Sequence, residues 1–189
     1  MKRLLLMALI SAVTARSAVP ATVDGIQVAD TVQLGSTTLV LNGAGRRTRL
    51  FFNLYIAALY LPSHASDAAK VLAEAGPKRV SLTMLRHLSA DQLIAALREG
   101  IGHNSTPAEV AQMKEQIDAL VATMAATNGA NQGDVLTIDF LPDGTTRVGH
   151  NGRASGKPIP GRNFQRALLK VWLGPNPVQV DLKKTLLGG

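Results

Sequence analysis

An arginine and a tyrosine beside a long apolar segment are the residues of this chain best suited to chemistry. Arg47 follows the segment Asn42-Gly43-Ala44-Gly45 and lies just before the apolar segment FFNLYIAALYL, residues 51–61, which contains Tyr55. The two are eight residues apart, an even separation, so in one regular strand both side chains would point to the same face. A guanidinium binds a carboxylate or an enolate-like oxygen through charge-assisted, often paired hydrogen bonds. We therefore expect an anion site at Arg47; the alternative is a solvated arginine at the start of a strand.

The chain lacks the familiar motifs of catalysis and cofactor binding. Gly43-x-Gly45 has no third glycine and precedes a strand rather than a helix, so it is not a dinucleotide fingerprint. There is no Walker lysine and no G-x-S-x-G serine motif. The absence of cysteine excludes disulfides, zinc ribbons, iron–sulfur sites and a cysteine nucleophile. The four histidines form no i, i+4 ligand pair, and we expect each at a surface or loop position: His64, His87, His103 and His150. We therefore predict no metal, and we also predict no cofactor.

The first 21 residues have the pattern of a secretory signal peptide. Lys2 and Arg3 precede an apolar run of about ten residues, 4–13, and mostly small residues then continue to Ala21. The apolar run is shorter than the roughly 20 residues that span a bilayer. We expect cleavage after Ala21 or, alternatively, after Ala15, and a mature single domain, residues 22–189, that is periplasmic or secreted. A buried N-terminal helix is the alternative.

The positive charge of the chain does not indicate a nucleic-acid partner. The formal charge is +7, and without Lys2, Arg3 and Arg16 there remain 17 Lys and Arg against 13 Asp and Glu, a charge of +4. No basic run reaches five residues, and only 4% of residues are aromatic. Binding to nucleic acid needs a basic patch and, for single strands, aromatic platforms. We therefore expect a small-molecule partner, and the oligomeric state stays open.

The elements expected around these residues form one α+β domain with an antiparallel sheet and helices gathered on one side. The segment 51–61 is apolar on both faces, as in a central strand that is covered twice. Two helices have clear starts: Ser89 with Gln92 forms one capping box, and Thr106 with Pro107 and Glu109 gives another start signal. Further strands are expected in 25–34, 37–42, 79–85, 134–141 and 145–150, further helices over 66–75, 161–172 and 180–187, and a loop over 151–160.

Three blocks of sequence resemble the chalcone-isomerase-like family. They are LNGAGRRTRLFFNLYIAALYLP at 41–62, the segment 133–140 with the turn at Gly144, and the stretch from Gly161 with Phe164, Trp172-Leu173-Gly174 and Leu186-Leu187-Gly188. The resemblance runs from about Val23 to the end and is closest to the bacterial, exported branch. It implies an open-faced β-sandwich, in which a large antiparallel sheet is covered by a helical layer with a cleft between them.

The resemblance also implies candidate site residues. In the plant enzymes an arginine guides the phenolate of a chalcone, a threonine and a tyrosine order a water at the ketone, and an asparagine and a Thr/Ser contact the far end. Non-catalytic relatives bind fatty acids with the carboxylate on that arginine. In this chain the five positions are Arg47, Tyr55, Leu97, Asn104 and Val171.

Only the arginine and the asparagine match the enzyme pattern, since Tyr55, Leu97 and Val171 replace the threonine, the tyrosine and the Thr/Ser. Leu97 also lies on the apolar face of its helix, which is typical of a packing residue. We expect a non-catalytic protein that binds a small amphipathic carboxylate such as a fatty acid. The alternatives are an intramolecular lyase or isomerase acting on a chalcone or another enone, with Arg47, Tyr55 and Asn104 as its candidate catalytic residues, and a partner-binding envelope protein without an open pocket.

Overall fold

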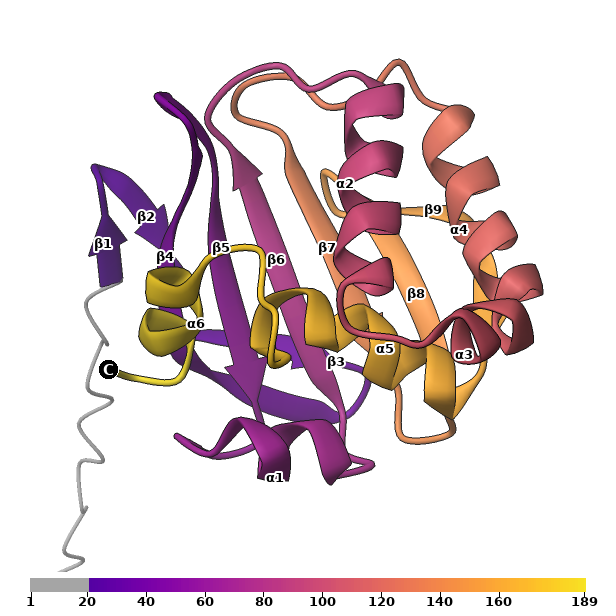
Figure 1. Ribbon diagram of the computed structural model, residues 1–189. Coiled ribbons are helices and arrows are strands. Elements are labelled where there is room, and N and C mark those ends of the chain that lie inside the picture. The colour runs from indigo at the N-terminus through magenta and orange to yellow at the C-terminus, as the bar shows by residue number, and fades with distance from the viewer. Residues whose placement is uncertain (1–20) are drawn as a thin grey trace, which may run out of the picture.

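A seven-stranded antiparallel sheet forms the centre of the computed structural model, which describes residues 21–189 (Figure 1). Neighbouring strands follow one another in the sequence, so every connection within the sheet joins adjacent strands. A separate short hairpin, β1 and β2, precedes the sheet. The strands are β1 (Ala21–Val23), β2 (Ile26–Val28), β3 (Thr31–Leu34), β4 (Thr37–Arg49), β5 (Phe52–Leu61), β6 (Lys78–Met84), β7 (Val135–Phe140), β8 (Thr145–His150) and β9 (Arg153–Pro160).

The helices gather on one face of this sheet, in front of it in Figure 1. Helix α5 carries the largest share of buried residues and packs between the sheet and its neighbours α1, α2 and α6. Helix α6 lies against β4, and α4 lies against β9. The helices are α1 (Ala68–Ala73), α2 (Ala90–Gly102), α3 (Pro107–Gln112), α4 (Lys114–Ala125), α5 (Arg162–Leu173) and α6 (Val180–Leu186). The predicted α+β open-faced sandwich is confirmed.

Strand β5 is buried on both faces, as its apolar sequence predicts. Tyr55, Ala57 and Leu59 belong to the large core between the sheet and the helices. The intervening Ile56 and Ala58 belong to a second core on the other face, which also includes Val28, Leu34 and Leu39 from β2, β3 and β4. Because successive side chains of a strand point to opposite faces, this one apolar segment contributes to two cores.

Strand β4 is longer than the sequence suggested, because Gly43 to Arg49 continue the strand instead of forming a connection. A Cβ on Gly43 would lie 2.0 Å from the Thr185 carbonyl oxygen, and one on Gly45 would lie 3.1 Å from Leu182. The two glycines therefore let the backbone of α6 approach the strand closely. The strand has a bulge between Leu41 and Gly43. There the Asn42 side-chain amide donates to the carbonyls of Ala65 and Leu186, and its oxygen accepts from the Ala65 N–H.

Both predicted helix starts are confirmed and both are capping boxes, but the helix that begins after Thr106 is two helices rather than one. Ser89 accepts from the Gln92 N–H at 3.2 Å, and Thr106 accepts from the Glu109 N–H at 3.2 Å. The break falls at Met113, whose backbone leaves the helical region at φ −104°. No residue of α3 is buried, whereas Met113 itself is, so the break lets α4 turn its own apolar side toward the core.

The segment 151–160 was expected to be a loop and is strand β9 over most of its length. It pairs with β8 as the last strand of the sheet, where a proline costs no central ladder hydrogen bond. Gly156 has φ +72° next to a register shift, and a Cβ there would lie 2.2 Å from Thr123 Oγ1 of α4. The glycine and the prolines thus accommodate a bulge and a close helix contact within a strand.

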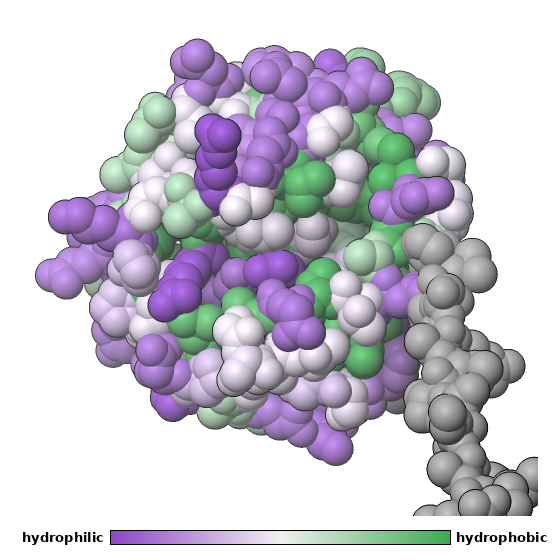
Figure 2. Space-filling view, turned by 180° about the vertical axis from the view of Figure 1, so that it is seen from behind, coloured by the Kyte–Doolittle hydropathy of each residue, from purple (hydrophilic) through white to green (hydrophobic). Residues whose placement is uncertain are grey.

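The predicted signal peptide lies outside the described residues, except for its last residue, Ala21, which opens β1. Within residues 21–189, no helix is long and apolar enough to cross a membrane. On the back of the molecule, hydrophobic residues lie in small groups among polar ones (Figure 2).

Candidate ligand-binding cleft

Arg47 and Tyr55 lie directly opposite each other on β4 and β5. They therefore share a face of the sheet, although the sequence argument had placed them on one strand. The Arg47 guanidinium is held by the Thr48 carbonyl and by Oε1 of Gln179, 3.3 Å away. Gln179 also accepts from the Thr48 N–H at 2.9 Å, so the residue before α6 fixes both the strand and its arginine.

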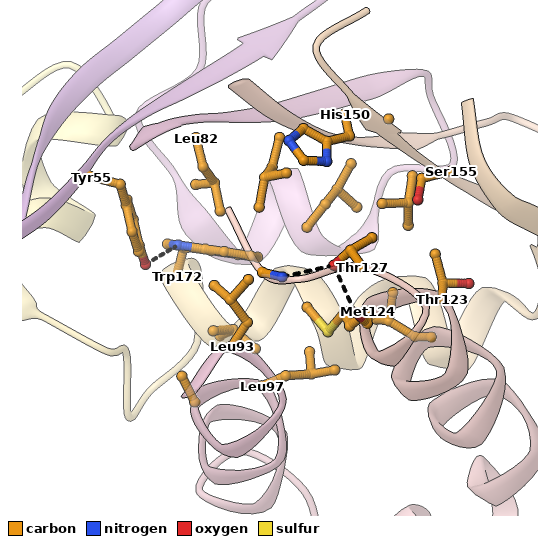
Figure 3. A pocket seen from close by; sticks show the side chains of 18 of the residues that line it. Tyr55, Leu82, Leu93, Leu97, Thr123, Met124, Thr127, His150, Ser155 and Trp172 are labelled. Carbon is orange, nitrogen blue, oxygen red and sulfur yellow. Dashed lines mark hydrogen bonds between the residues drawn. The ribbon is translucent and has the colours of Figure 1, made fainter. Parts of the chain in front are cut away.

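Tyr55 is buried and joins the sheet to α5. Its hydroxyl accepts a hydrogen bond from Nε1 of Trp172 at 3.3 Å (Figure 3). Burial raises the pKa of the Tyr55 hydroxyl above its ordinary value, while the Trp172 hydrogen bond and the Arg47 charge act in the opposite direction. The hydroxyl is therefore protonated at neutral pH, and its hydrogen is able to donate to a ligand oxygen.

The outer part of the cleft is a cavity of about 610 Å³ with a mixed apolar and charged lining, between the β4–β5 hairpin and α2, which we call the outer chamber. Three arginines line it, against one carboxylate, that of Glu99. Glu99 lies 3.5 Å from Arg49 in an exposed ion pair, which screens that arginine only weakly. The chamber is thus a positively charged place for an anionic group, lined by Arg47, Arg49 and Arg86.

The inner part is an apolar cavity of about 110 Å³ between the sheet, α2, α4 and α5, which we call the inner chamber (Figure 3). Most of its lining is aliphatic or aromatic, with a few polar groups at the β8–β9 side, among them His150 and Ser155. The two chambers share four lining residues: Tyr55, Leu93, Ala96 and Val178. Tyr55 therefore stands at the junction between a cationic chamber and an apolar one.

Leu97 and Val171, two further predicted site residues, both line the inner chamber and are buried. They come from α2 and α5, which approach closely at Gly100, where a Cβ would lie 2.8 Å from Val171. These side chains offer no polar group to a ligand, so the inner wall they form is suited to a hydrocarbon.

Asn104 lies apart from the other predicted site residues and lines neither chamber. Its side-chain amide donates to the carbonyls of Gly100 and Asn176 at 2.9 and 2.7 Å, and its oxygen accepts from the Asn176 N–H at 3.0 Å. The two bonds with Asn176 tie the end of α2 to the loop after α5. In this structure the Asn104 side chain is engaged with backbone groups.

His150 is a cleft residue that the sequence did not reveal, since an isolated histidine gave no spacing signal. It ends β8, lines the inner chamber, and its Nε2 lies 3.0 Å from Oδ2 of Asp134. Hydrogen bonds from Asn151 and from the Asn131 N–H, together with the imidazole, lower the pKa of Asp134 to about 2. Across residues 21–189 no cluster of three or more potential metal ligands was found.

Comparison with known proteins identifies the family and agrees with the fold. Residues 20–188 match the family model described as chalcone isomerase-like, so the chain belongs to that family. No curated protein matches the chain. Among solved structures, the chain is similar to the Arabidopsis thaliana fatty-acid binding protein AtFAP1, with a TM-score of 0.65 and 13% identity over 86% of this chain and 92% of that one. At this identity the likeness concerns the fold.

Proposed function

We propose that the cleft binds a small amphipathic carboxylate, of which a fatty acid is the simplest example, and that the protein does not catalyse isomerisation. One observation carries the proposal: the cationic outer chamber at Arg47 adjoins the apolar inner chamber at Tyr55. A carboxylate would accept hydrogen bonds from the guanidinium and from the protonated tyrosine. The family match and the likeness to a fatty-acid binding protein support the same ligand class.

The volumes of the two chambers favour a ligand that spans both. Cavities that bind small molecules usually measure about 300–1,000 Å³. The inner chamber is smaller than this range, whereas the outer one lies within it. A ligand with its head group in the outer chamber and its chain directed past Tyr55 would place its charge beside the arginines of the outer chamber. Its hydrocarbon chain would contact the apolar wall of the inner chamber.

The side chains at positions 97 and 171 of the inner chamber argue against the isomerase alternative. A chalcone ketone that develops negative charge needs hydrogen-bond donors, and each lost donor costs about 10²–10³ in rate. Leu97 and Val171 supply none. The cavity beside Arg47 likewise argues against a partner-binding protein with a closed core.

Titration with a fluorescent fatty acid tests the proposal. Arg47→Ala should weaken binding roughly tenfold to a hundredfold, as expected for loss of a hydrogen bond to a charged group. Arg147→Ala is the matched control, because Arg147 is an exposed strand arginine that lines neither chamber. Equal binding by wild type and Arg47→Ala would overturn the proposal, and chalcone turnover above the spontaneous rate would favour the isomerase instead.

We also propose that the protein acts outside the cytoplasm, as the basic and apolar pattern of residues 1–21 suggests. Cell fractionation followed by intact-mass analysis tests this part separately. A periplasmic or secreted product that begins at Thr22, or at the alternative site after Ala15, is expected. A cytoplasmic product that keeps its first 21 residues would contradict export without touching the ligand proposal.

A further inference from the structure

The turn between β4 and β5 exposes three consecutive large hydrophobic residues. Leu50 is 82% exposed, Phe51 96% and Phe52 54%; among the described residues, Val180 on α6 is the one other exposed large hydrophobic. Single exposed apolar side chains are common on protein surfaces, but a contiguous group indicates an interaction site. We call Leu50, Phe51 and Phe52 the hairpin tip.

The backbone of the hairpin tip makes these residue types unexpected on structural grounds. Arg49 pairs with Phe52, so Leu50 and Phe51 form a two-residue connection, for which Asn-Gly or Asp-Gly is the usual choice. Leu50 also adopts φ +55°, a left-handed conformation that costs energy for a leucine. Neither Leu50 nor Phe51 recovers this cost by packing, since both side chains are exposed.

Positive charge surrounds the hairpin tip. The Arg86 guanidinium lies 4.4 Å from the centre of the Phe52 ring, in a cation–π contact. Arg49 is the residue before the tip, and its side chain is 58% exposed despite the ion pair with Glu99. The tip is therefore an apolar point with cationic groups at its base, a pattern that matches the hydrocarbon and the anionic headgroups of a bilayer.

We propose that the hairpin tip docks the protein onto a bilayer that contains anionic lipids. A protein partner fits less well, because stable interfaces bury about 800 Å² on each side and three side chains on a convex turn supply less than that. In Figure 1 the β4–β5 hairpin projects at the upper left, and Figure 2 shows hydrophobic residues reaching the surface on the corresponding upper right.

Docking through the hairpin tip would place the outer chamber at the lipid surface. Leu50 and Phe52 line that chamber, together with the three arginines named above. An amphipathic molecule would then pass between bilayer and cleft without exposing its apolar part to water. The docking argument rests on the tip and its charges alone and does not require the proposed ligand.

Flotation with lipid vesicles tests the docking proposal. Residues 21–189 contain all the core residues of the described part of the chain and leave out the apolar N-terminal segment, which would bind vesicles by itself. Vesicles of phosphatidylethanolamine with phosphatidylglycerol should bind the protein, and Phe51→Ser should lower the partition coefficient about tenfold or more. Val180→Ser is the matched control, because it also removes an exposed hydrophobic, and it should bind like wild type.

Charge variants complete the test. Arg49→Gln with Arg86→Gln should weaken binding to the anionic vesicles, and added salt should do the same to wild type. Failure of wild type to float, or equal flotation by Phe51→Ser, overturns the proposal. The docking proposal is also overturned if the protein does not bind vesicles but forms a dimer in sedimentation velocity that Phe51→Ser abolishes. The hairpin tip would then be a contact between two copies of the chain. Fatty-acid titration without vesicles reports on the ligand proposal separately.

Discussion

Arg47 on β4 and Tyr55 on β5 are direct cross-strand partners, and this pairing brings a guanidinium and a buried phenol to one side of the cleft. Trp172 from α5 donates to the phenol at 3.3 Å, and Gln179 accepts from the guanidinium at 3.3 Å. Two strands and the helical layer thus fix the positions of both groups before any ligand arrives. Such preorganisation reduces the entropy that binding must overcome.

Replacing Tyr55 with phenylalanine should destabilise the fold as well as alter the cleft. The substitution leaves Nε1 of the buried Trp172 without its acceptor, which costs about 1–3 kcal/mol. Tyr60→Phe is the control, because Tyr60 is buried on the opposite face of the same strand. Urea unfolding should show a clearly larger loss for Tyr55→Phe; equal losses would mean that the Trp172 contact contributes nothing measurable.

Replacing Asn104 with alanine should affect stability rather than ligand binding. The change removes one hydrogen bond to Gly100 of α2 and two to Asn176 in the loop after α5, and a loss of about 1–3 kcal/mol is expected in urea unfolding. Folded Asn104→Ala should bind a fluorescent fatty acid as wild type does. Asn128→Ala, outside the helices and strands, is the control, and a selective loss of affinity in Asn104→Ala would place this residue in the binding site.

Replacing Gly43 with alanine should push α6 away from β4. The new Cβ would lie 2.0 Å from the Thr185 carbonyl oxygen, a backbone atom that cannot rotate aside, so we expect a loss of about 1–3 kcal/mol. Gly102→Ala provides the comparison, because no atom lies within 4 Å of the place that its Cβ would take, and its stability should change little. Thermal unfolding that fails to separate the two variants would contradict this packing.

The stability of the protein should fall in acid partly through Asp134. Its pKa is about 2 in the folded protein, below the roughly 3.9 of an unfolded aspartate. The charged form is therefore favoured by folding, and this contribution is present above about pH 4 and is lost as the pH falls toward 2. Asp134→Asn should lose less stability than wild type over that interval in urea unfolding. Parallel pH profiles for the two proteins would refute the assignment.

Much of the fold follows from local sequence signals. The capping boxes at Ser89 and Thr106 and the two-sided apolar strand through Ile56 and Leu59 all have short-range causes, and the structure confirms them. Gly43 and Gly156 were misleading, because glycine marks both a turn and a place where another element approaches closely. Only the positions of α6 and α4, which are remote in sequence, distinguish these two cases.

The cleft was less predictable than the fold. The even spacing of Arg47 and Tyr55 gave the right face by an argument that assumed one strand, whereas the residues lie on two. Gln179, which holds Arg47, is 132 residues away from it, and His150 reaches the inner chamber through the register of β8. Contacts of this kind depend on how the sheet and helices pack, and no spacing in the sequence encodes them.

The central claim is that Arg47 recognises a carboxylate whose chain occupies the apolar chamber, and one comparison tests it most directly. Affinities for a fatty acid and for its methyl ester are measured with wild type and with Arg47→Ala. Wild type should prefer the acid roughly tenfold or more, and Arg47→Ala should bind both alike with an affinity close to that of wild type for the ester. An acid preference of the same size in both proteins would contradict the account.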